Sequence, residues 1–223
     1  MVALVLGVEA SPAADLPKDT NTIESLTPEQ ARRLAAEFPG VEVVLREVHG
    51  PVTYNFCLPL NRLRSIDVET ARALVGYKRG PLVLNGLVTL EADVAKVLAA
   101  YRAGYLMLHG LEALDVGAAK VLAGSTSWDG LLPRVTTFDS PDSIDVAKAL
   151  AKRKLPLCFP NLKKISAKTL SALIEKRDVE IPFTDSLEMI PEPDGSFNDD
   201  FVMPLWLEHK QQRKRQEQAG KPF

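Results

Sequence analysis

The side chains in this sequence that could act in catalysis or bind a metal are few and widely spaced. Its three histidines, His49, His109 and His209, fall in separate parts of the chain. Cys57 and Cys158 have no companions at metal-ligand spacing and are too few for a disulfide framework. The H-E-x-x-H, G-x-S-x-G, G-x-G-x-x-G and P-loop patterns are all absent. The sequence therefore predicts no catalytic residue, no metal site and no cofactor.

Two polar stretches combine other residue types that could do chemistry. Ser125–Ser127 reads Ser-Thr-Ser, but no His or Asp stands at an offset typical of a nucleophilic site, so we interpret it as a turn. Pro193–Asp200 gathers four side chains whose oxygen atoms could bind calcium: Asp194, Asn198, Asp199 and Asp200. The stretch lacks the EF-hand spacing and a closing Glu, which favours a solvated acidic turn.

Composition and charge limit the class of protein. The 223 residues are 46% hydrophobic and carry a formal net charge of -2, whereas general nucleic-acid and membrane-surface binding need a net basic surface. We expect no nucleic-acid partner, and no membrane span because no apolar run approaches roughly 18 residues. Val2–Val8 could be a remnant signal, but no basic residue precedes it and Glu9 follows, which favours a frayed N-terminus. The localisation, cytoplasmic or exported, stays open.

A repeat of 24 residues organises the elements that would position any site. Three units between Leu58 and Gly124 follow the pattern L-x-L-x-x-L-x-x-L-x-x-x-x-A-x-x-L. In the clearest pair, five apolar residues recur 24 positions later, since Leu84, Leu87, Leu90, Ala95 and Leu98 are matched by Leu108, Leu111, Leu114, Ala119 and Leu122. Weaker copies begin at Ile23 and Phe159, and the spacing slips by four before Ala147.

These copies divide the chain into three parts. Residues 1–22 form an N-terminal segment, residues 23–190 hold the repeat with an insert at 41–56, and residues 191–223 form a C-terminal cap and a basic polar tail. A repeat stack needs its last apolar face covered, and we expect Trp206 and Leu207 to cover it. The basic run Arg213–Arg215 could contact an acidic partner but is more typical of a solvated helix.

Each unit has the pattern of a short strand followed by a helix. Leu-x-Leu alternation is typical of a strand, and the later i, i+4, i+8 spacing with alanines is helical. Thr27–Gln30 predicts a capping box, and Gly80 and Gly104 are expected to end helices. Because one unit cannot bury its apolar stripe alone, we expect the units to stack.

Two stretches are the most regular, "PLVLNGLVTLEADVAKVLAAYRAG" and "YLMLHGLEALDVGAAKVLAG". They resemble leucine-rich repeats, in the L-x-L-x-G-L variety of bacterial, planctomycete-type proteins, and the resemblance extends loosely over residues 23–190. It implies an α/β fold, a leucine-rich-repeat solenoid of strand–helix units with a parallel sheet on one face, used for binding. The chain departs from the family in one respect, because Asn61 and Asn85 do not occupy the position of the usual asparagine ladder. A layered α/β domain with a parallel sheet is the alternative fold.

Strand geometry places one set of side chains on the sheet face that points away from the core. If Leu106 and Leu108 point inward, Tyr105, Met107 and His109 point outward. The same register extends this weakly charged patch across the neighbouring strands, giving Cys57, Pro59, Asn61, Pro81, Val83, Asn85, Tyr105, Met107, His109, Cys158 and Pro160. Such exposed patches often mark partner sites, unless the N-terminal segment, the insert or the C-terminal region folds over them.

We therefore expect a non-catalytic protein-interaction module that presents this strand face to a protein partner. The alternatives are an enzyme with a site on the same face near His109, or a structural component of a larger assembly. Catalysis requires convergent titratable groups, and the face has one His, two Asn and no acid. Cys57 and Cys158 should stay free thiols, because about four strands, or roughly 19 Å, separate them in the repeat order.

Overall fold

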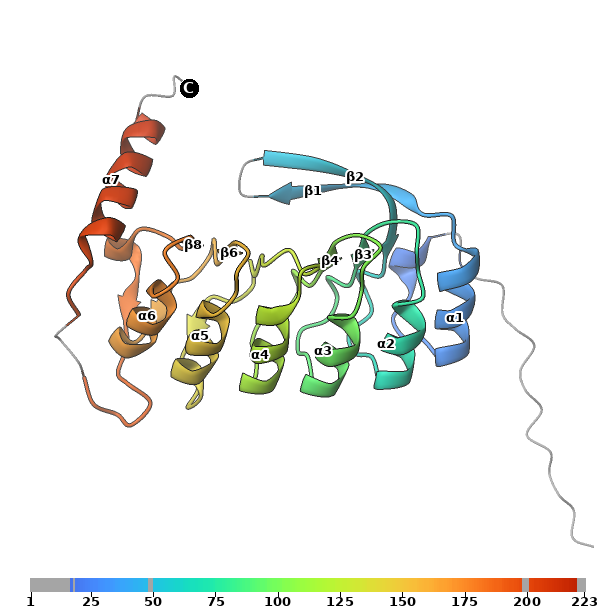
Figure 1. The fold of residues 1–223 in the computed structure, drawn as a ribbon, viewed down its shortest axis with the longest axis horizontal. Helices are drawn as coiled ribbons and strands as arrows, with labels where there is room; N and C mark the ends of the chain where they lie inside the picture. The colour runs from blue at the N-terminus through green and yellow to red at the C-terminus, as the bar shows by residue number, and fades with distance from the viewer. Residues whose placement is uncertain (1–16, 18, 48–49, 198–200, 220–223) are drawn as a thin grey trace, which may run out of the picture.

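The computed structural model describes residue 17 and residues 19–47, 50–197 and 201–219. Helices α1 to α6 lie side by side in chain order, with short strands along one side of the row (Figure 1). The helices are α1 Pro28–Glu37, α2 Val68–Leu74, α3 Ala92–Leu98, α4 Val116–Gly124, α5 Ser143–Ala151, α6 Ala167–Ile174 and α7 Leu205–Ala219. The strands are β1 Val41–Glu47, β2 Gly50–Pro59, β3 Leu82–Val83, β4 Leu106–Met107, β5 Thr137–Phe138, β6 Leu157–Cys158, β7 Lys164–Ile165, β8 Val179–Glu180 and β9 Glu188–Met189. Two 3-10 helices complete the order, η1 Thr20–Thr22 and η2 Thr184–Ser186.

The strands of the regular units pair in parallel with the 24-residue register that the sequence predicts. Leu58 pairs with Leu82, and Leu82 with Leu106. Isolated parallel bridges continue the order from Leu106 to Trp128 and from Leu131 to Cys158, and β6 then pairs with β8. A second small parallel sheet has the order β5-β7-β9. The prediction of an α/β fold with parallel strands is thus confirmed.

The two cysteines are free thiols, as predicted. Cys57 lies in β2 and Cys158 in β6, and β3, β4 and the Trp128 segment stand between these strands in the pairing order.

Local signals set where the helices begin. Thr27 and Gln30 form the predicted capping box, with both of its hydrogen bonds present. In later units a short polar side chain caps the helix by accepting from the backbone N–H three residues on, and these caps are Asp67, Asp115 and Ser166.

The prediction that Gly80 and Gly104 end helices is wrong. α2 ends at Leu74 and α3 at Leu98, several residues before either glycine. A Cβ at Gly80 would lie 2.6 Å from the carbonyl oxygen of Phe56, and one at Gly104 would lie 2.8 Å from the backbone of Gly80. These glycines therefore allow the backbones of successive units to approach each other closely.

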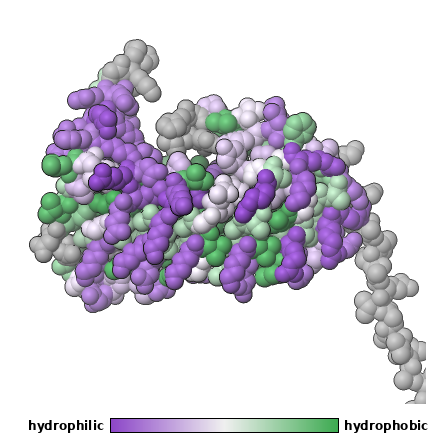
Figure 2. Space-filling model, in the orientation of Figure 1, coloured by the Kyte–Doolittle hydropathy of each residue, from purple (hydrophilic) through white to green (hydrophobic). Residues whose placement is uncertain are grey.

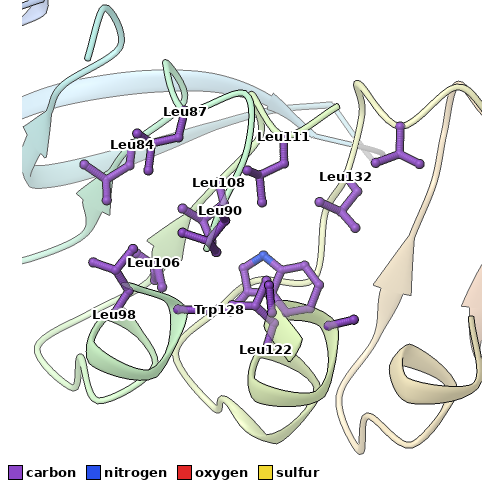
Figure 3. Packing of buried hydrophobic residues seen from close by; sticks show 14 of the residues in the cluster. Leu84, Leu87, Leu90, Leu98, Leu106, Leu108, Leu111, Leu122, Trp128 and Leu132 are labelled. Atoms are coloured by element: carbon purple, nitrogen blue, oxygen red, sulfur yellow. The ribbon is translucent and has the colours of Figure 1, made fainter. Parts of the chain in front are cut away.

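The core lies between the strands and the helices. Leu84, Leu108 and Leu132 occupy the same position in successive units and are fully buried (Figure 3). Trp128 lies among them with 1% of its surface exposed. It fills the core in a unit where the leucine repeat is irregular, so the spacing did not indicate it. Removing this apolar surface from water is the main stabilising contribution, about 25 cal/mol per Å² buried.

Four buried polar side chains, each a few residues after the end of a helix, form a column of contacts between successive units. Each donates a hydrogen bond to a main-chain carbonyl oxygen of the preceding unit, in the pairs Tyr77 to Phe56, Tyr101 to Gly80, Arg153 to Ser125 and Lys176 to Arg153. All four donor residues are buried. The contacts satisfy carbonyl groups that would otherwise lack a partner in the interior.

Both ends of the stack are covered. Thr20 of η1 donates from its hydroxyl to the carbonyl oxygen of Pro59, at 2.6 Å. At the other end α7 packs through the buried residues Leu207 and Gln211, with Trp206 partly buried against the core. Helix α7 projects on the same side as the β1–β2 hairpin (Figure 1), and its surface is largely hydrophilic (Figure 2).

Candidate functional site

The insert at 41–56 forms most of a hairpin that folds back over the strand face. β1 and β2 pair antiparallel, and the end of β2 continues into the parallel sheet beside β3. Three partly buried residues of the hairpin, Val43, Leu45 and Tyr54, pack on a small buried cluster of Cys57, Val83 and Met107. The hairpin thus covers apolar side chains that would otherwise face water.

Five of the residues predicted to be exposed are buried. Cys57, Val83 and Met107 have no exposed surface, and Pro59 and Pro81 are also buried. The register on which the prediction rested is confirmed, because Pro59 pairs with Val83 and Val83 with Met107. The predicted exposure is wrong, because the alternating apolar residues of the insert supply a complementary face.

Two unusual backbone conformations lie where the hairpin meets the sheet. Gly40 has φ +87° and Phe56 has φ +58°, and the β1–β2 register shifts between Val41 and Val43. A bulky residue rarely adopts positive φ, which costs about 1–3 kcal/mol. The carbonyl oxygen of Phe56 accepts from the hydroxyl of Tyr77, which fixes this bend.

Tyr105 remains at the surface, as predicted. Its residue is 51% exposed, and its ring meets Tyr54 of the hairpin edge to face, with the centroids 5.9 Å apart. The hairpin therefore holds one side of the ring and leaves the rest accessible.

Asn85, His109 and Asp129 form a hydrogen-bonded row across successive strands. Oδ1 of Asn85 accepts from the backbone N–H of His109 at 3.0 Å, and Nε2 of His109 lies 2.6 Å from Oδ2 of Asp129. The side chains of His109 and Asp129 are 11% and 14% exposed. Asn85 thus joins two units by a side-chain bond, at a position one residue after the strand leucine.

Asn61 lies apart from this row. Its Nδ2 donates to Oδ1 of Asn21 at 2.7 Å, and its own Oδ1 is buried with no partner among the described residues. Sequence reasoning missed Asp129, because it follows Trp128 in the irregular unit, where the repeat gives no register.

A histidine paired with a carboxylate can act as a general base when a nucleophile or a water molecule reaches it. Cys158, in β6 on the same side of the units, is of a residue type that can serve as such a nucleophile. Burial raises the pKa of its thiol to about 12, and the negative charge of Glu180 acts in the same direction. The thiol is therefore protonated at neutral pH and a poor nucleophile.

Further along the strand order than β4, the apolar side chains of the hairpin no longer cover the strand face. We term this part the open strand face and define it by Tyr105, His109, Asp129, Cys158 and Glu180. Cys158 pairs in register with Glu180, and the charges of Glu180 and Asp129 both raise the pKa of the Cys158 thiol. In Figure 1, β6 and β8 lie between the hairpin and α7.

Helix α7 borders the open strand face with basic side chains. Nζ of Lys210 lies 2.7 Å from one carboxylate oxygen of Glu180, and Nζ of Lys214 lies 3.7 Å from the other. Arg215 pairs with Asp185 at 2.7 Å, so much of the basic run contacts the body of the protein. The face therefore combines an aromatic ring with charges of both signs.

The other predicted positions add no site. Asp194 accepts from the backbone and hydroxyl of Ser196, as in a turn, while residues 198–200 and His49 lie outside the described residues. Within the described ranges, no three His, Cys, Asp or Glu side chains are grouped so as to hold a metal ion. No helix in those ranges has the length and apolar character to cross a membrane. No protein-family model, curated protein or solved structure matches this chain.

Proposed function

We propose that this protein is a leucine-rich-repeat solenoid that binds a protein partner through its open strand face and catalyses no reaction. The 24-residue strand register and the side-by-side helices support the solenoid assignment. The observation that carries the binding proposal is Tyr105, a 51% exposed aromatic residue held against Tyr54 at the edge of the covered face. Tyrosines anchored in this way supply much of the binding energy of protein interfaces.

The surroundings of Tyr105 suit an interface. Asp129 and Glu180 supply carboxylates, and Lys210 and Lys214 supply ammonium groups. Such mixed charge fixes the orientation of a partner more than it adds affinity. Because the hairpin covers part of the strand face, the surface left for a partner is the part nearer α7.

The His109–Asp129 pair is the observation that favours an enzyme, and it supports that alternative less well. Oδ1 of Asp129 also accepts from the backbone N–H of Leu131 at 3.2 Å, so both carboxylate oxygens of Asp129 have partners within the protein. A base needs a substrate proton within reach, and both side chains are mostly buried.

Site-specific photo-crosslinking tests the proposal in the native host. A photoreactive phenylalanine analogue is placed at Tyr105, at Glu180, or at Lys96, an exposed residue of α3 that serves as the control. We expect Tyr105 and Glu180 to crosslink to one and the same protein, and Lys96 not to. Equal crosslinking from Lys96, or different proteins from the two face positions, would contradict the proposal.

A further inference from the structure

A hollow of about 510 Å³ lies beside α4 and α5 and is lined by residues of both helices and of the segments that follow them. It is separate from the open strand face. Its walls are mostly small side chains with Leu155, and three lysines line it, Lys120, Lys152 and Lys154. None of its lining residues is acidic. The volume is in the range of about 300–1,000 Å³ found for small-molecule sites.

The three lysines have no bonded partner in the part of the chain that the structure describes. No ion pair or hydrogen bond there engages their ammonium groups, and all three residues are exposed. The ammonium groups of most other described lysines are engaged, namely those of Lys78, Lys96, Lys148, Lys164, Lys176, Lys210 and Lys214. Unpaired positive charge is therefore concentrated at this hollow.

Comparison with the other units shows why Lys120 has no acidic partner on its own helix. At the equivalent position of other units, a basic residue pairs with an acid three residues earlier, in the pairs Arg72 with Glu69, Lys96 with Asp93 and Lys148 with Asp145. In α4 the acid is replaced by Gly117. A Cβ at Gly117 would lie 2.7 Å from Cβ of Ala92, so close packing of α3 and α4 excludes an acid there.

A helix C-terminus normally repels an anion, because its last carbonyl groups carry partial negative charge. At the end of α4, the guanidinium of Arg153 neutralises two such carbonyl groups. Arg153 is 3% exposed and donates to the carbonyl oxygens of Leu122 at 3.3 Å and Ser125 at 2.8 Å. Its fixed charge adds to that of the three lysines, and the exposed residue Thr126 contributes a hydroxyl group.

We infer that this hollow binds a small anion carrying several phosphate groups. Lysines act as point charges that suit phosphate oxygens from varied directions. Three ammonium groups lining one bounded hollow match a small polyanion better than an extended acidic peptide. The inference is independent of the proposed partner binding, because the two surfaces share no residue.

Isothermal titration calorimetry with inorganic tripolyphosphate tests the inference. The variant Lys120→Ala/Lys152→Ala/Lys154→Ala should lose roughly 30-fold or more in affinity, because three charge-assisted contacts are removed. The matched control is Lys163→Ala/Lys168→Ala, which removes two exposed lysines that lie outside the hollow and should change the affinity by less than about twofold. Thermal melts of both variants should match the parent, since no hydrogen bond or ion pair among the described residues engages these ammonium groups.

Three results would overturn the inference. The first is the absence of tripolyphosphate binding by the parent protein. The second is an equal loss of affinity in the control variant, which would indicate attraction by the whole surface. The third is tighter binding of a hexaglutamate peptide than of tripolyphosphate at equal ionic strength, which would assign the hollow to an acidic protein segment.

Discussion

At the scale of single residues, many polar side chains of this protein serve the main chain of a neighbouring unit. Tyr101 donates to the carbonyl oxygen of Gly80, and burial raises the pKa of its phenol. Asn85 accepts from the backbone of His109. Polar residues in the interior thus lie where successive units contact each other.

Tyr101→Phe should lower the free energy of unfolding by about 1–3 kcal/mol, because the buried carbonyl of Gly80 loses its donor. Chemical denaturation measures the loss. Tyr105→Phe is the control, since Tyr105 is half exposed, and it should change stability by less than about 0.5 kcal/mol. Equal effects of the two variants would show that the column of buried donors does not stabilise the stack.

Tyr105→Ala and Met107→Ala should have opposite consequences. The first should weaken capture of the crosslinked partner by about 1–3 kcal/mol and leave the melting temperature nearly unchanged. The second should destabilise the protein by about 2–5 kcal/mol, because it opens a cavity under the hairpin. Partner titrations and matched melts separate the two effects, and unfolding caused by Tyr105→Ala would contradict its assignment to the surface.

The cysteines should react slowly with iodoacetamide in the native protein. Burial raises the pKa of Cys158 to about 12 and that of Cys57 to about 11, both above the ordinary value of a cysteine thiol. A raised thiol pKa favours the neutral form, so at pH 8 the thiolate fraction falls by roughly 100- to 1,000-fold. Mass spectrometry should show little alkylation before denaturant is added and two alkylated cysteines afterwards. Rapid native alkylation of Cys158 would revive the enzyme alternative.

At the scale of elements, the sequence predicts the regular units well and the insert poorly. The alternation of residues in the strands and the 24-residue spacing predict that the leucines point inward and that Met107 points outward. Both directions follow from the regular spacing of nearby residues. The hairpin could not be predicted in this way. Its path depends on positive φ at Gly40 and Phe56 and on contacts with Val83, which lies in the strand of the next unit.

The irregular unit after α4 shows the same limit. The leucine spacing fails there, and Trp128 fills the core beside the guanidinium of Arg153, 4.6 Å from its ring centroid. Neither residue belongs to the repeat pattern, so Asp129, next to Trp128, could not be placed near His109 from sequence. The candidate site was therefore predicted only in part.

Gly110→Ala should disrupt the turn that follows β4. A Cβ at this position would lie 2.7 Å from the carbonyl oxygen of Leu87 and still closer to that of Asn85, so the units must separate. We expect a loss of about 1–3 kcal/mol or more in denaturation experiments. Gly124→Ala is the control, because a Cβ there meets nothing within 4 Å. A neutral Gly110→Ala would refute the close approach of the two turns.

At the scale of the whole molecule, the stack presents two different sides. The helices carry exposed ion pairs such as Lys96 with Asp93, while the strand side is partly occupied by the chain's own hairpin. Under the proposed function, a partner would bind the open strand face between the hairpin and α7. This arrangement requires that the hairpin cover Met107 in solution.

Methionine oxidation tests this claim most directly. The native protein is treated with hydrogen peroxide, and peptide mapping follows sulfoxide formation at Met107 and, for comparison, at the partly buried Met203. Since buried thioethers oxidise slowly, Met107 should react at least about tenfold more slowly than Met203. Oxidation of Met107 as fast as Met203, in protein that remains folded, would show that the hairpin does not cover Met107 in solution.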